Sequence, residues 1–327
     1  MNLVTGAAGF IGSNLVASLE KLGGEIAVCD RFDHPAKVEN LSKRTLAYQI
    51  HPNEIFRFFA DHRGEIDTVF LLGAISSTTE TRVKLIAKIN VELPIRIWNW
   101  CRDNQIRLIY ASSAATYGDG SLGFVDNSSM GELKKLKPLN AYGRSKNEFD
   151  IWVSEQVRVG GGTPPQWAGL KFFNVYGPNE YHKGAQMSVV PQIYKQISET
   201  GRARLFQSHH PGYEDGGQLR DFIWVGDCIS VMRWLNQNPQ ISGLFNCGTG
   251  RARSFLDLTK VVFDAMGKEV GIDYIPTPEH LREKYQYFTE ANMNKLKSTG
   301  YSEEFTSLED GVRLYVTNYL ATKDRYV

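Results

Sequence analysis

The glycine-rich loop near the start of the chain restricts the possible folds more than any other feature. It runs Thr5-Gly-Ala-Ala-Gly-Phe-Ile-Gly12, directly after the apolar run Asn2-Leu3-Val4 and at the start of a helical pattern that extends to Leu22. Between a strand and a helix, such glycines allow a tight turn, a close approach of the backbone to a pyrophosphate and close helix packing. The loop therefore predicts dinucleotide binding by Gly6, Gly9, Phe10, Ile11 and Gly12.

Short apolar runs alternate with helical patterns through the first half of the chain. After the first strand, further strands are expected near residues 26–29, 45–49, 68–72, 108–111 and 167–173. Helices are expected near residues 52–62, 83–104 and 142–157. This alternation predicts an α/β fold, a Rossmann-like doubly wound parallel sheet with helices on both faces.

Beyond residue 173 the loops become longer and the helical and strand patterns shorter. We therefore expect a dinucleotide-binding Rossmann domain over residues 1–173 and a smaller C-terminal substrate-binding region over residues 174–327. Residues about 220–250 are expected to return to the Rossmann domain. Because no long linker separates the two parts, they should be in close contact.

Composition argues against several classes of protein. With 327 residues, 42% of them hydrophobic, and a formal net charge of +1, the chain can bury a large core and has no bias toward nucleic acid or membrane surfaces. No apolar run approaches the ~20 residues needed to cross a bilayer, so a cytoplasmic location is expected. The four cysteines are scattered without paired spacing, and no metal site is expected.

Three side chains suggest proton-transfer chemistry. Tyr142 and Lys146 are four residues apart, which puts them on one face of a helix. A neighbouring lysine and an oxidised nicotinamide ring would both favour the tyrosine phenolate. Ser113 follows the strand at 108–111, at the strand edge where ligands bind in open α/β sheets. Together they predict a catalytic trio that transfers a proton to and from a sugar hydroxyl.

Asp30 ends the second expected strand, where an acidic residue usually accepts a hydrogen bond from the adenosine ribose of NAD. Arg31 follows directly and Lys37 lies close behind, and two cations would suit the additional 2′-phosphate of NADP. We therefore expect NADP as the cofactor, with NAD as the alternative, and all three residues at the cofactor.

With the glycine loop, Ser112-Ser113 and Tyr142 to Lys146 in this order, the chain resembles the extended short-chain dehydrogenase/reductase family. Members of that family epimerise, dehydrate or reduce nucleotide sugars. Further motifs resemble its ADP-L-glycero-D-manno-heptose 6-epimerase branch: Gly73-Ala-Ile-Ser-Ser-Thr-Thr-Glu80, Ala111-Ser-Ser-Ala-Ala-Thr-Tyr-Gly118, Phe173-Asn-Val-Tyr-Gly-Pro178, His182-Lys183-Gly184, Arg220-Asp-Phe222, Phe245-Asn-Cys-Gly-Thr-Gly-Arg251 and Tyr285-Gln-Tyr-Phe-Thr289. The resemblance covers nearly the whole chain.

The resemblance implies interconversion of the D-glycero and L-glycero forms of an ADP-heptose through transient oxidation at C6. It implies Lys183 as a second acid/base beside Tyr142, one for each position of the C6 oxygen. It adds cofactor contacts at Leu72, Gly73, Ala74, Ser76, Asn90 and Val175. It adds substrate contacts at Ser113, Asn174, Lys183, Gln192, Phe206, Arg220 and Tyr285. It also suggests a homo-oligomer, a pentamer.

The chain departs from the family pattern in places. Ala185 and Gln192 replace a serine and a histidine that the family commonly places at the substrate, and Leu72 replaces an acidic residue beside the cofactor. The segment between Phe206 and Arg220 is also longer than in the family. These changes bear on substrate recognition and leave the hydride chemistry intact.

Two other functions remain open from the sequence. One is another nucleotide-sugar enzyme, either a C4-epimerase or a reductase. A dehydratase is disfavoured because Ala114 and Ala115 follow Ser113 where that enzyme usually has acidic residues. The other is a non-catalytic cofactor-binding regulator, since a fold does not guarantee a function. The retained Ser113, Tyr142 and Lys146 argue against it.

Overall fold

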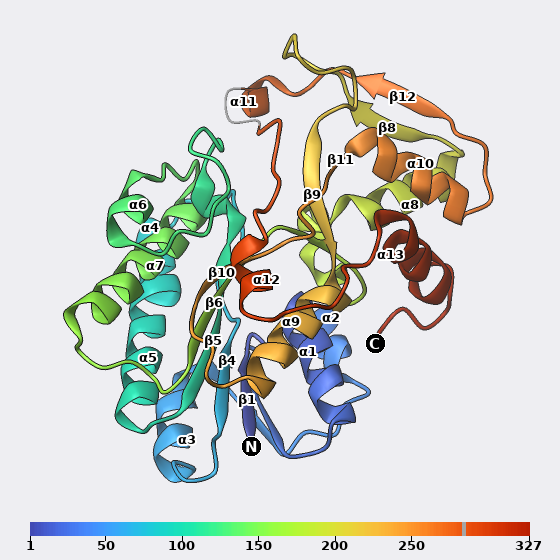
Figure 1. Ribbon diagram of the computed structural model, residues 1–327. Helices are drawn as coiled ribbons and strands as arrows, with labels where there is room; N and C mark the ends of the chain where they lie inside the picture. The colour runs from blue at the N-terminus through green and yellow to red at the C-terminus, as the bar shows by residue number, and fades with distance from the viewer. Residues whose placement is uncertain (283–285) are drawn as a thin grey trace.

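A seven-stranded parallel sheet forms the centre of the larger lobe in the computed structural model, which describes residues 1–282 and 286–327 (Figure 1). Its strand order is β10-β6-β5-β4-β1-β2-β3. The strands are β1 (Asn2–Thr5), β2 (Ile26–Cys29), β3 (Tyr48–Ile50), β4 (Thr68–Leu71), β5 (Arg107–Ser113), β6 (Trp167–Phe172) and β10 (Gly243–Cys247). The order reverses direction at β1, and ligands bind at the carboxyl edge beside such a switch point.

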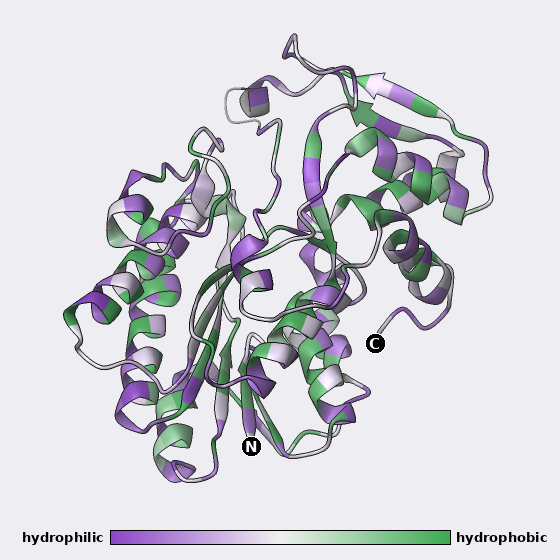
Figure 2. Ribbon diagram, in the orientation of Figure 1, coloured by the Kyte–Doolittle hydropathy of each residue, from purple (hydrophilic) through white to green (hydrophobic). Residues whose placement is uncertain are grey.

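Helices cover both faces of this sheet and build two apolar cores. On one face lie α1 (Phe10–Lys21) and α9 (Val225–Gln237), which pack against each other (Figure 1). On the other face lie α3 (Ile55–Asp61), α5 (Leu93–Asp103) and α7 (Ala141–Val159). Figure 2 shows hydrophobic residues gathered along the strands and the inner helix faces. The predicted α/β, Rossmann-like fold is confirmed.

The elements agree with the predicted alternation, with two local differences. The third strand is Tyr48–Ile50 and begins later than the expected 45–49. The expected helix at 83–104 consists of α4 (Val83–Ala87), a π-turn η3 (Lys88–Glu92) and α5. A π-turn inserts an additional residue into a helix and shifts the side-chain register, which hydrophobic periodicity does not reveal.

The smaller lobe is built from two short sheets and three main helices. One sheet has the order β11-β9-β7, and the other pairs β12 with β8. The strands are β7 (Asn174–Tyr176), β8 (Ala203–Phe206), β9 (Leu219–Trp224), β11 (Ala252–Ser254) and β12 (Ile272–Ile275). The helices are α8 (Val189–Thr200), α10 (Phe255–Ala265), α13 (Leu308–Tyr315) and its π-helical continuation η6 (Val316–Leu320).

The chain thus returns to the large sheet at α9 and β10 after entering the smaller lobe at β7. The domain boundaries at 173 and 220–250 remain predictions.

The short helices are α2 (Pro35–Val38), η1 (Glu39–Leu41), η2 (Pro52–Glu54), η4 (Ala114–Tyr117), α6 (Met130–Lys135), η5 (Tyr181–Gln186), α11 (Glu279–Arg282) and α12 (Asn294–Ser298).

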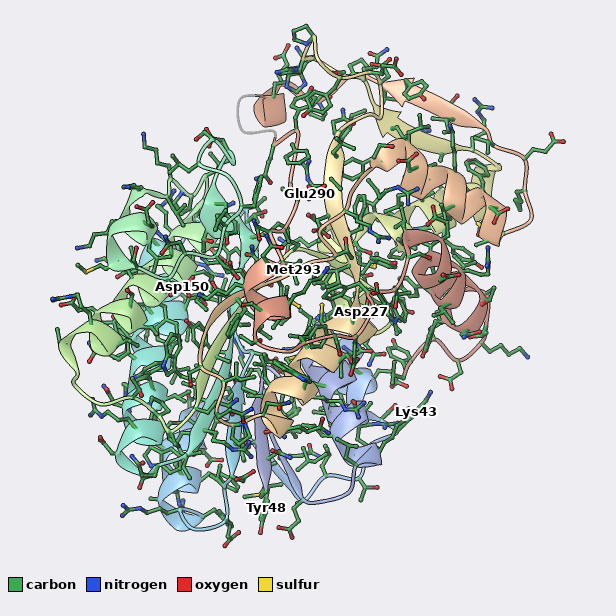
Figure 3. All side chains as sticks on the ribbon, viewed as in Figure 1. Lys43, Tyr48, Asp150, Asp227, Glu290 and Met293 are labelled. Carbon is green, nitrogen blue, oxygen red and sulfur yellow. The ribbon has the colours of Figure 1, made fainter. Side chains whose placement is uncertain are left out.

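Side chains fill the space between α7 and the sheet, and Asp150 on α7 is among those labelled in Figure 3. Within the described residues, every helix is too short or too polar to cross a membrane.

Candidate active site

The glycine-rich loop leaves no room for side chains at Gly6 and Gly12. Gly6 has a φ of +65°, and a Cβ built on it would lie 2.6 Å from the Cα of Gly73, in the loop after β4. A Cβ on Gly12 would overlap the carbonyl oxygen of Gly6. Gly9 is the N-cap of α1 and, as a glycine, has no side chain to cap the first N–H groups. Those N–H groups can therefore bind a phosphate, as the sequence predicts.

A cavity of about 480 Å³ opens beside this loop, at the carboxyl edge of β1, β2 and β4. Its volume is typical of a small-molecule site. The predicted cofactor residues that line it are Gly6, Asp30, Arg31, Lys37, Gly73 and Ala74. A glycine-lined cradle, an uncapped helix N-terminus and an adjoining cavity fit a dinucleotide.

Sequence reasoning missed part of the lining of this cavity. His51, Pro52 and Asn53 follow β3, and Ile75 and Ile89 come from the segments after β4. Because β3 ends at the same edge of the sheet, the rule that ligands bind at strand carboxyl ends could have predicted residues 51–53. The two isoleucines give no such signal, since apolar residues equally predict a core.

Asp30 and the two neighbouring cations are bound within the protein. One oxygen of the Asp30 carboxylate accepts a hydrogen bond from Ala8 N at 3.0 Å, and the other accepts one from Lys37 Nζ at 2.5 Å. Arg31 Nη2 lies 2.5 Å from Asp33 Oδ2, and the Arg31 side chain is 70% exposed. A 2′-phosphate would therefore have to draw both cations from the carboxylates that hold them here.

Asn90 fastens the loop after β4 to the helix that carries Tyr142. It lies in the π-turn η3. Such turns are rare in proteins, and many of those known lie at functional sites. Its Oδ1 accepts a hydrogen bond from Ile75 N at 2.9 Å, and its Nδ2 donates to Ile75 O and to Ser145 Oγ, each at 3.0 Å. The predicted cofactor residues of this loop, which Asn90 holds in place, are Leu72, Gly73, Ala74 and Ser76.

Ser113, Tyr142 and Lys146 meet where β5 ends against α7. The Ser113 hydroxyl caps η4 by accepting a hydrogen bond from Ala115 N at 3.1 Å, and it also hydrogen-bonds the Tyr142 phenol. Lys146 Nζ donates to Ala111 O, two residues before Ser113, at 2.9 Å. The structure therefore brings the three predicted catalytic side chains together at the strand edge.

Burial dominates the proton affinities of these groups. It raises the pKa of Tyr142; the hydrogen bond from Ser113 lowers that pKa, and the Asp150 carboxylate raises it. Burial also lowers the pKa of Lys146 to about 8, against the opposite effect of Asp150. The expected phenolate is thus not favoured by the protein alone, because burial outweighs the effect of Ser113 on the Tyr142 pKa. It requires further positive charge at the site.

Lys183 lies over the first residue of α1. Its Nζ is 5.3 Å from the centre of the Phe10 ring, which places it next to the glycine-rich loop. Burial lowers the pKa of Lys183, and the nearby Glu180 carboxylate opposes that shift. A lysine with a lowered pKa can exchange a proton nearer to neutral pH than a solvated one, as a general acid or base must.

Three asparagines connect residues 178–179, which lead to Lys183, with the helices α1 and η1. Asn14 Nδ2 donates to Pro178 O at 3.0 Å, and Asn40 Nδ2 donates to Asn179 O at 3.0 Å. Asn179, in turn, donates to Ser13 Oγ at 3.0 Å. All three asparagines are buried. The network fixes the chain leading to Lys183 against α1 and η1.

Three other predicted residues lie in β7 and α8. Asn174 is exposed, and its Oδ1 accepts a hydrogen bond from Thr289 Oγ1 at 3.4 Å. Val175 packs against the apolar core on the α1 side of the sheet. Gln192 of α8 donates from Nε2 to Met187 O, just before the start of that helix, at 2.7 Å. Its amide group therefore already has a hydrogen-bond partner nearby in the chain.

The remaining substrate residues approach from β8 and β9. Phe206 ends β8 and is partly buried. Arg220 donates to Leu219 O at 2.8 Å and to Gln286 O, and its guanidinium lies 5.5 Å from the Phe255 ring centre. Tyr285 lies outside the described residues.

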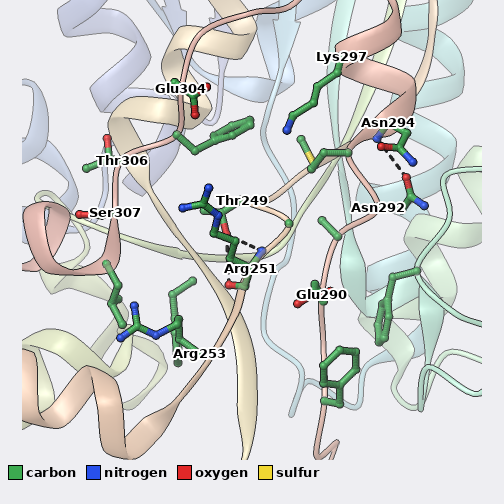
Figure 4. A pocket seen from close by; sticks show the side chains of 18 of the residues that line it. Thr249, Arg251, Arg253, Glu290, Asn292, Asn294, Lys297, Glu304, Thr306 and Ser307 are labelled. Carbon is green, nitrogen blue, oxygen red and sulfur yellow. Dashed lines mark hydrogen bonds between the residues drawn. The ribbon is translucent and has the colours of Figure 1, made fainter.

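A larger cavity, of about 580 Å³, contains none of the predicted catalytic or cofactor residues among those that line it. Figure 4 shows Arg251, Arg253, Glu290 and Lys297 around this cavity. The predicted site residues therefore do not lie at the larger of these two cavities.

Comparison with known proteins shows the family of the chain. The model of the NAD dependent epimerase/dehydratase family matches residues 2–248. An ADP-L-glycero-D-manno-heptose-6-epimerase from Nitratidesulfovibrio vulgaris is 48% identical over 330 residues, and the match covers 100% of both chains. The chain belongs to the ADP-L-glycero-D-manno-heptose-6-epimerase family.

Two further members of the heptose-epimerase family are similar over nearly their whole length. The Fusobacterium nucleatum enzyme is 44% identical over 336 residues, covering 100% of both chains. The crystal structure of the Helicobacter pylori enzyme has a TM-score of 0.78 at 25% identity, covering 97% of this chain and 95% of that one. The resemblance inferred from the motifs is confirmed.

Proposed function

We propose that the protein is an epimerase that interconverts ADP-D-glycero-D-manno-heptose and ADP-L-glycero-D-manno-heptose at C6. The observation that carries the proposal is the contact between Ser113 and Tyr142 beside Lys146, at the sheet edge that also holds the glycine-rich loop. The 48% identity to a relative of that name over the full length supports the choice of sugar.

The cofactor of this reaction is a nicotinamide dinucleotide, bound by the glycine-rich loop, the uncapped start of α1 and the cavity beside them. When bound, it supplies reversible hydride transfer, which no protein side chain provides. Arg31 and Lys37 at the cavity favour NADP over NAD, because each can form a charge-assisted hydrogen bond to a 2′-phosphate once it leaves the carboxylate that holds it. NAD is the alternative.

The side chains manage the proton of the C6 hydroxyl. A base must accept this proton when C6 is oxidised to a planar ketone, and an acid must return it when the alcohol forms again. Tyr142, hydrogen-bonded to Ser113, serves one position of the oxygen. Rotation about the C5–C6 bond moves the oxygen to a second position, which Lys183 serves. Lys146 supports the phenolate of Tyr142 through its positive charge.

The substrate-binding role of Asn174, Gln192, Phe206, Arg220 and Tyr285 belongs to the same proposal. An arginine such as Arg220 suits a pyrophosphate through its fork of N–H donors. A cytoplasmic location and assembly as a homo-oligomer, a pentamer, are also proposed. Light scattering coupled to size-exclusion chromatography measures the assembly.

The deciding experiment is turnover of the proposed substrate. Purified protein with added NADP⁺ is incubated with ADP-D-glycero-D-manno-heptose, and the configuration at C6 is followed by NMR. We expect approach to a mixture of both C6 epimers. Substrate that keeps its configuration, under conditions in which cofactor binding is demonstrated, would overturn the proposed reaction.

A further inference from the structure

A fully buried ion pair lies directly behind the proposed catalytic side chains. Lys171 of β6 and Asp150 of α7 both have side chains that are 0% exposed, and Lys171 Nζ lies 2.8 Å from Asp150 Oδ2. Replacing such a pair by apolar residues of similar volume is often neutral or even stabilising. Stability alone therefore does not account for two buried charges at this position.

Asp150 joins the catalytic helix to the strand that ends at Ser113. Its Oδ2 accepts a hydrogen bond from Ser112 Oγ at 2.6 Å. One helical turn earlier, Lys146 donates to Ala111 O at 2.9 Å. Two side chains from one face of α7 thus hold adjacent residues of β5. This double attachment fixes the helix, and with it Tyr142, relative to the strand.

Lys171 contacts the turn that follows Ser113 at the end of β5. Its Nζ donates to Thr116 Oγ1 at 2.7 Å, and Thr116 Oγ1 donates to the carbonyl oxygen of Ser113 at 2.8 Å. These contacts hold the turn that aims the Ser113 hydroxyl, which also accepts a hydrogen bond from Ala115 N. The ion pair therefore connects both partners of the Ser113–Tyr142 contact.

We infer that Lys171 and Asp150 are positioning residues, which hold Ser113 and Tyr142 in the geometry that proton transfer requires. The inference rests on the proposed function and assigns neither residue a contact with substrate. The Lys171 ammonium also opposes the charge of the Asp150 carboxylate. That carboxylate already raises the pKa of Tyr142, and without Lys171 it would raise it further. The pair thus acts on Tyr142 in two separable ways: it fixes the position of that side chain, and its cation opposes the effect of Asp150 on the Tyr142 pKa.

The test removes the pair in two ways. The double variant Lys171→Met, Asp150→Leu replaces both charges by apolar groups, whereas Lys171→Met alone leaves Asp150 without its cation. The control is Arg253→Met with Glu309→Leu, which removes a partly exposed ion pair of the same 2.8 Å separation in the smaller lobe. For each protein we measure thermal unfolding, the dissociation constant of NADP, and kcat and KM as functions of pH.

The double variant should fold and bind NADP with wild-type affinity, but lose about 10- to 100-fold in kcat with little change in KM, because small displacements of reacting groups have effects of this size. Because the carboxylate that raises the Tyr142 pKa is gone, its pH profile should stay at that of the wild type or move slightly to lower pH. Lys171→Met should in addition shift the profile to higher pH. The control pair should leave kcat and the profile unchanged.

A folded double variant with wild-type kcat would overturn the inference. So would a loss of activity that only follows the loss of folded protein. If the single variant does not fold, the double variant and Lys171→Arg test the inference. The arginine keeps the positive charge and changes the geometry. We therefore expect Lys171→Arg to lower kcat without moving the pH profile. The wild type is assayed first. If it does not epimerise the heptose, the proposed function fails; if it does and the double variant equals it, only the positioning inference fails.

Discussion

Tyr142 lies on α7, and Lys183 lies on η5, beside Phe10 of the glycine-rich loop. If each serves one position of the C6 oxygen, Tyr142→Phe and Lys183→Met should both stall epimerisation. Tyr142→Phe should keep its affinity for the cofactor and lose roughly 10²-fold or more in turnover, because only proton transfer is removed. Disproportionation of C6-aldehyde analogues, measured beside epimerisation, should persist in either variant. Epimerisation by Lys183→Met at the wild-type rate would contradict the two-base scheme and favour a ring-C4 epimerase.

Lys146 should make turnover sensitive to alkaline pH. Burial lowers its pKa to about 8, so it carries a positive charge below that pH and loses it as the pH rises. Because this charge favours the Tyr142 phenolate, kcat/KM should fall above about pH 8. Lys146→Arg, which keeps its proton throughout, should not show that fall, whatever its absolute rate. A wild-type profile that stays level well beyond about pH 9 would refute the role of the ammonium.

Arg31 should distinguish the two cofactors. A charge-assisted hydrogen bond to the 2′-phosphate contributes roughly 1.5–3 kcal/mol, and NAD has no group there to lose. Arg31→Ala should therefore weaken NADP binding about 10- to 100-fold and leave NAD binding nearly unchanged. Calorimetric titration measures both, with Arg57→Ala on α3 as an exposed control. Equal losses for NADP and NAD would make NAD the better assignment.

The loop between β1 and α1 gives a prediction at the scale of an element. Gly12→Ala would place a Cβ against the carbonyl oxygen of Gly6, so the loop must open. We expect a loss of about 1–3 kcal/mol in unfolding free energy, and clearly weaker cofactor binding. The control is Gly131→Ala in α6, where a Cβ meets nothing within 4 Å. That change should stabilise the protein by up to about 1 kcal/mol. Unchanged cofactor affinity in Gly12→Ala would argue against this loop as the binding site.

Elements were easier to predict from the sequence than the contacts between them. The strands and helices of the large sheet follow from apolar periodicity, which depends only on neighbours in the chain. The asparagine network could not be predicted this way, because Asn14 and Asn40 bind residues 164 and 139 positions away. Neither could the partners of Arg31 and Lys37, since a cation in a sequence has no preferred carboxylate. That Ser113, Tyr142 and Lys146 would lie together was predictable, because a strand end and a helix face fix where their side chains meet.

At the scale of the whole molecule, these asparagines tie the two lobes together beside the cofactor cavity. NADP at about 100 times its dissociation constant should therefore raise the unfolding free energy by about 2.7 kcal/mol in a single transition. Differential scanning calorimetry with and without cofactor measures this. Two transitions, only one of which moves with NADP, would mean that the lobes unfold independently.

The position of β10 in the sheet has a consequence for protein synthesis. β10 pairs with β6, yet roughly seventy residues, which include much of the smaller lobe and α9, separate the two strands in the chain. At about 5–20 residues per second, a ribosome needs several seconds to add them. During that time β6 is a bare strand edge, and such edges readily pair with other chains. The growing chain is thus most prone to aggregate after its first six parallel strands have been made, and a fragment that stops there keeps this hazard permanently.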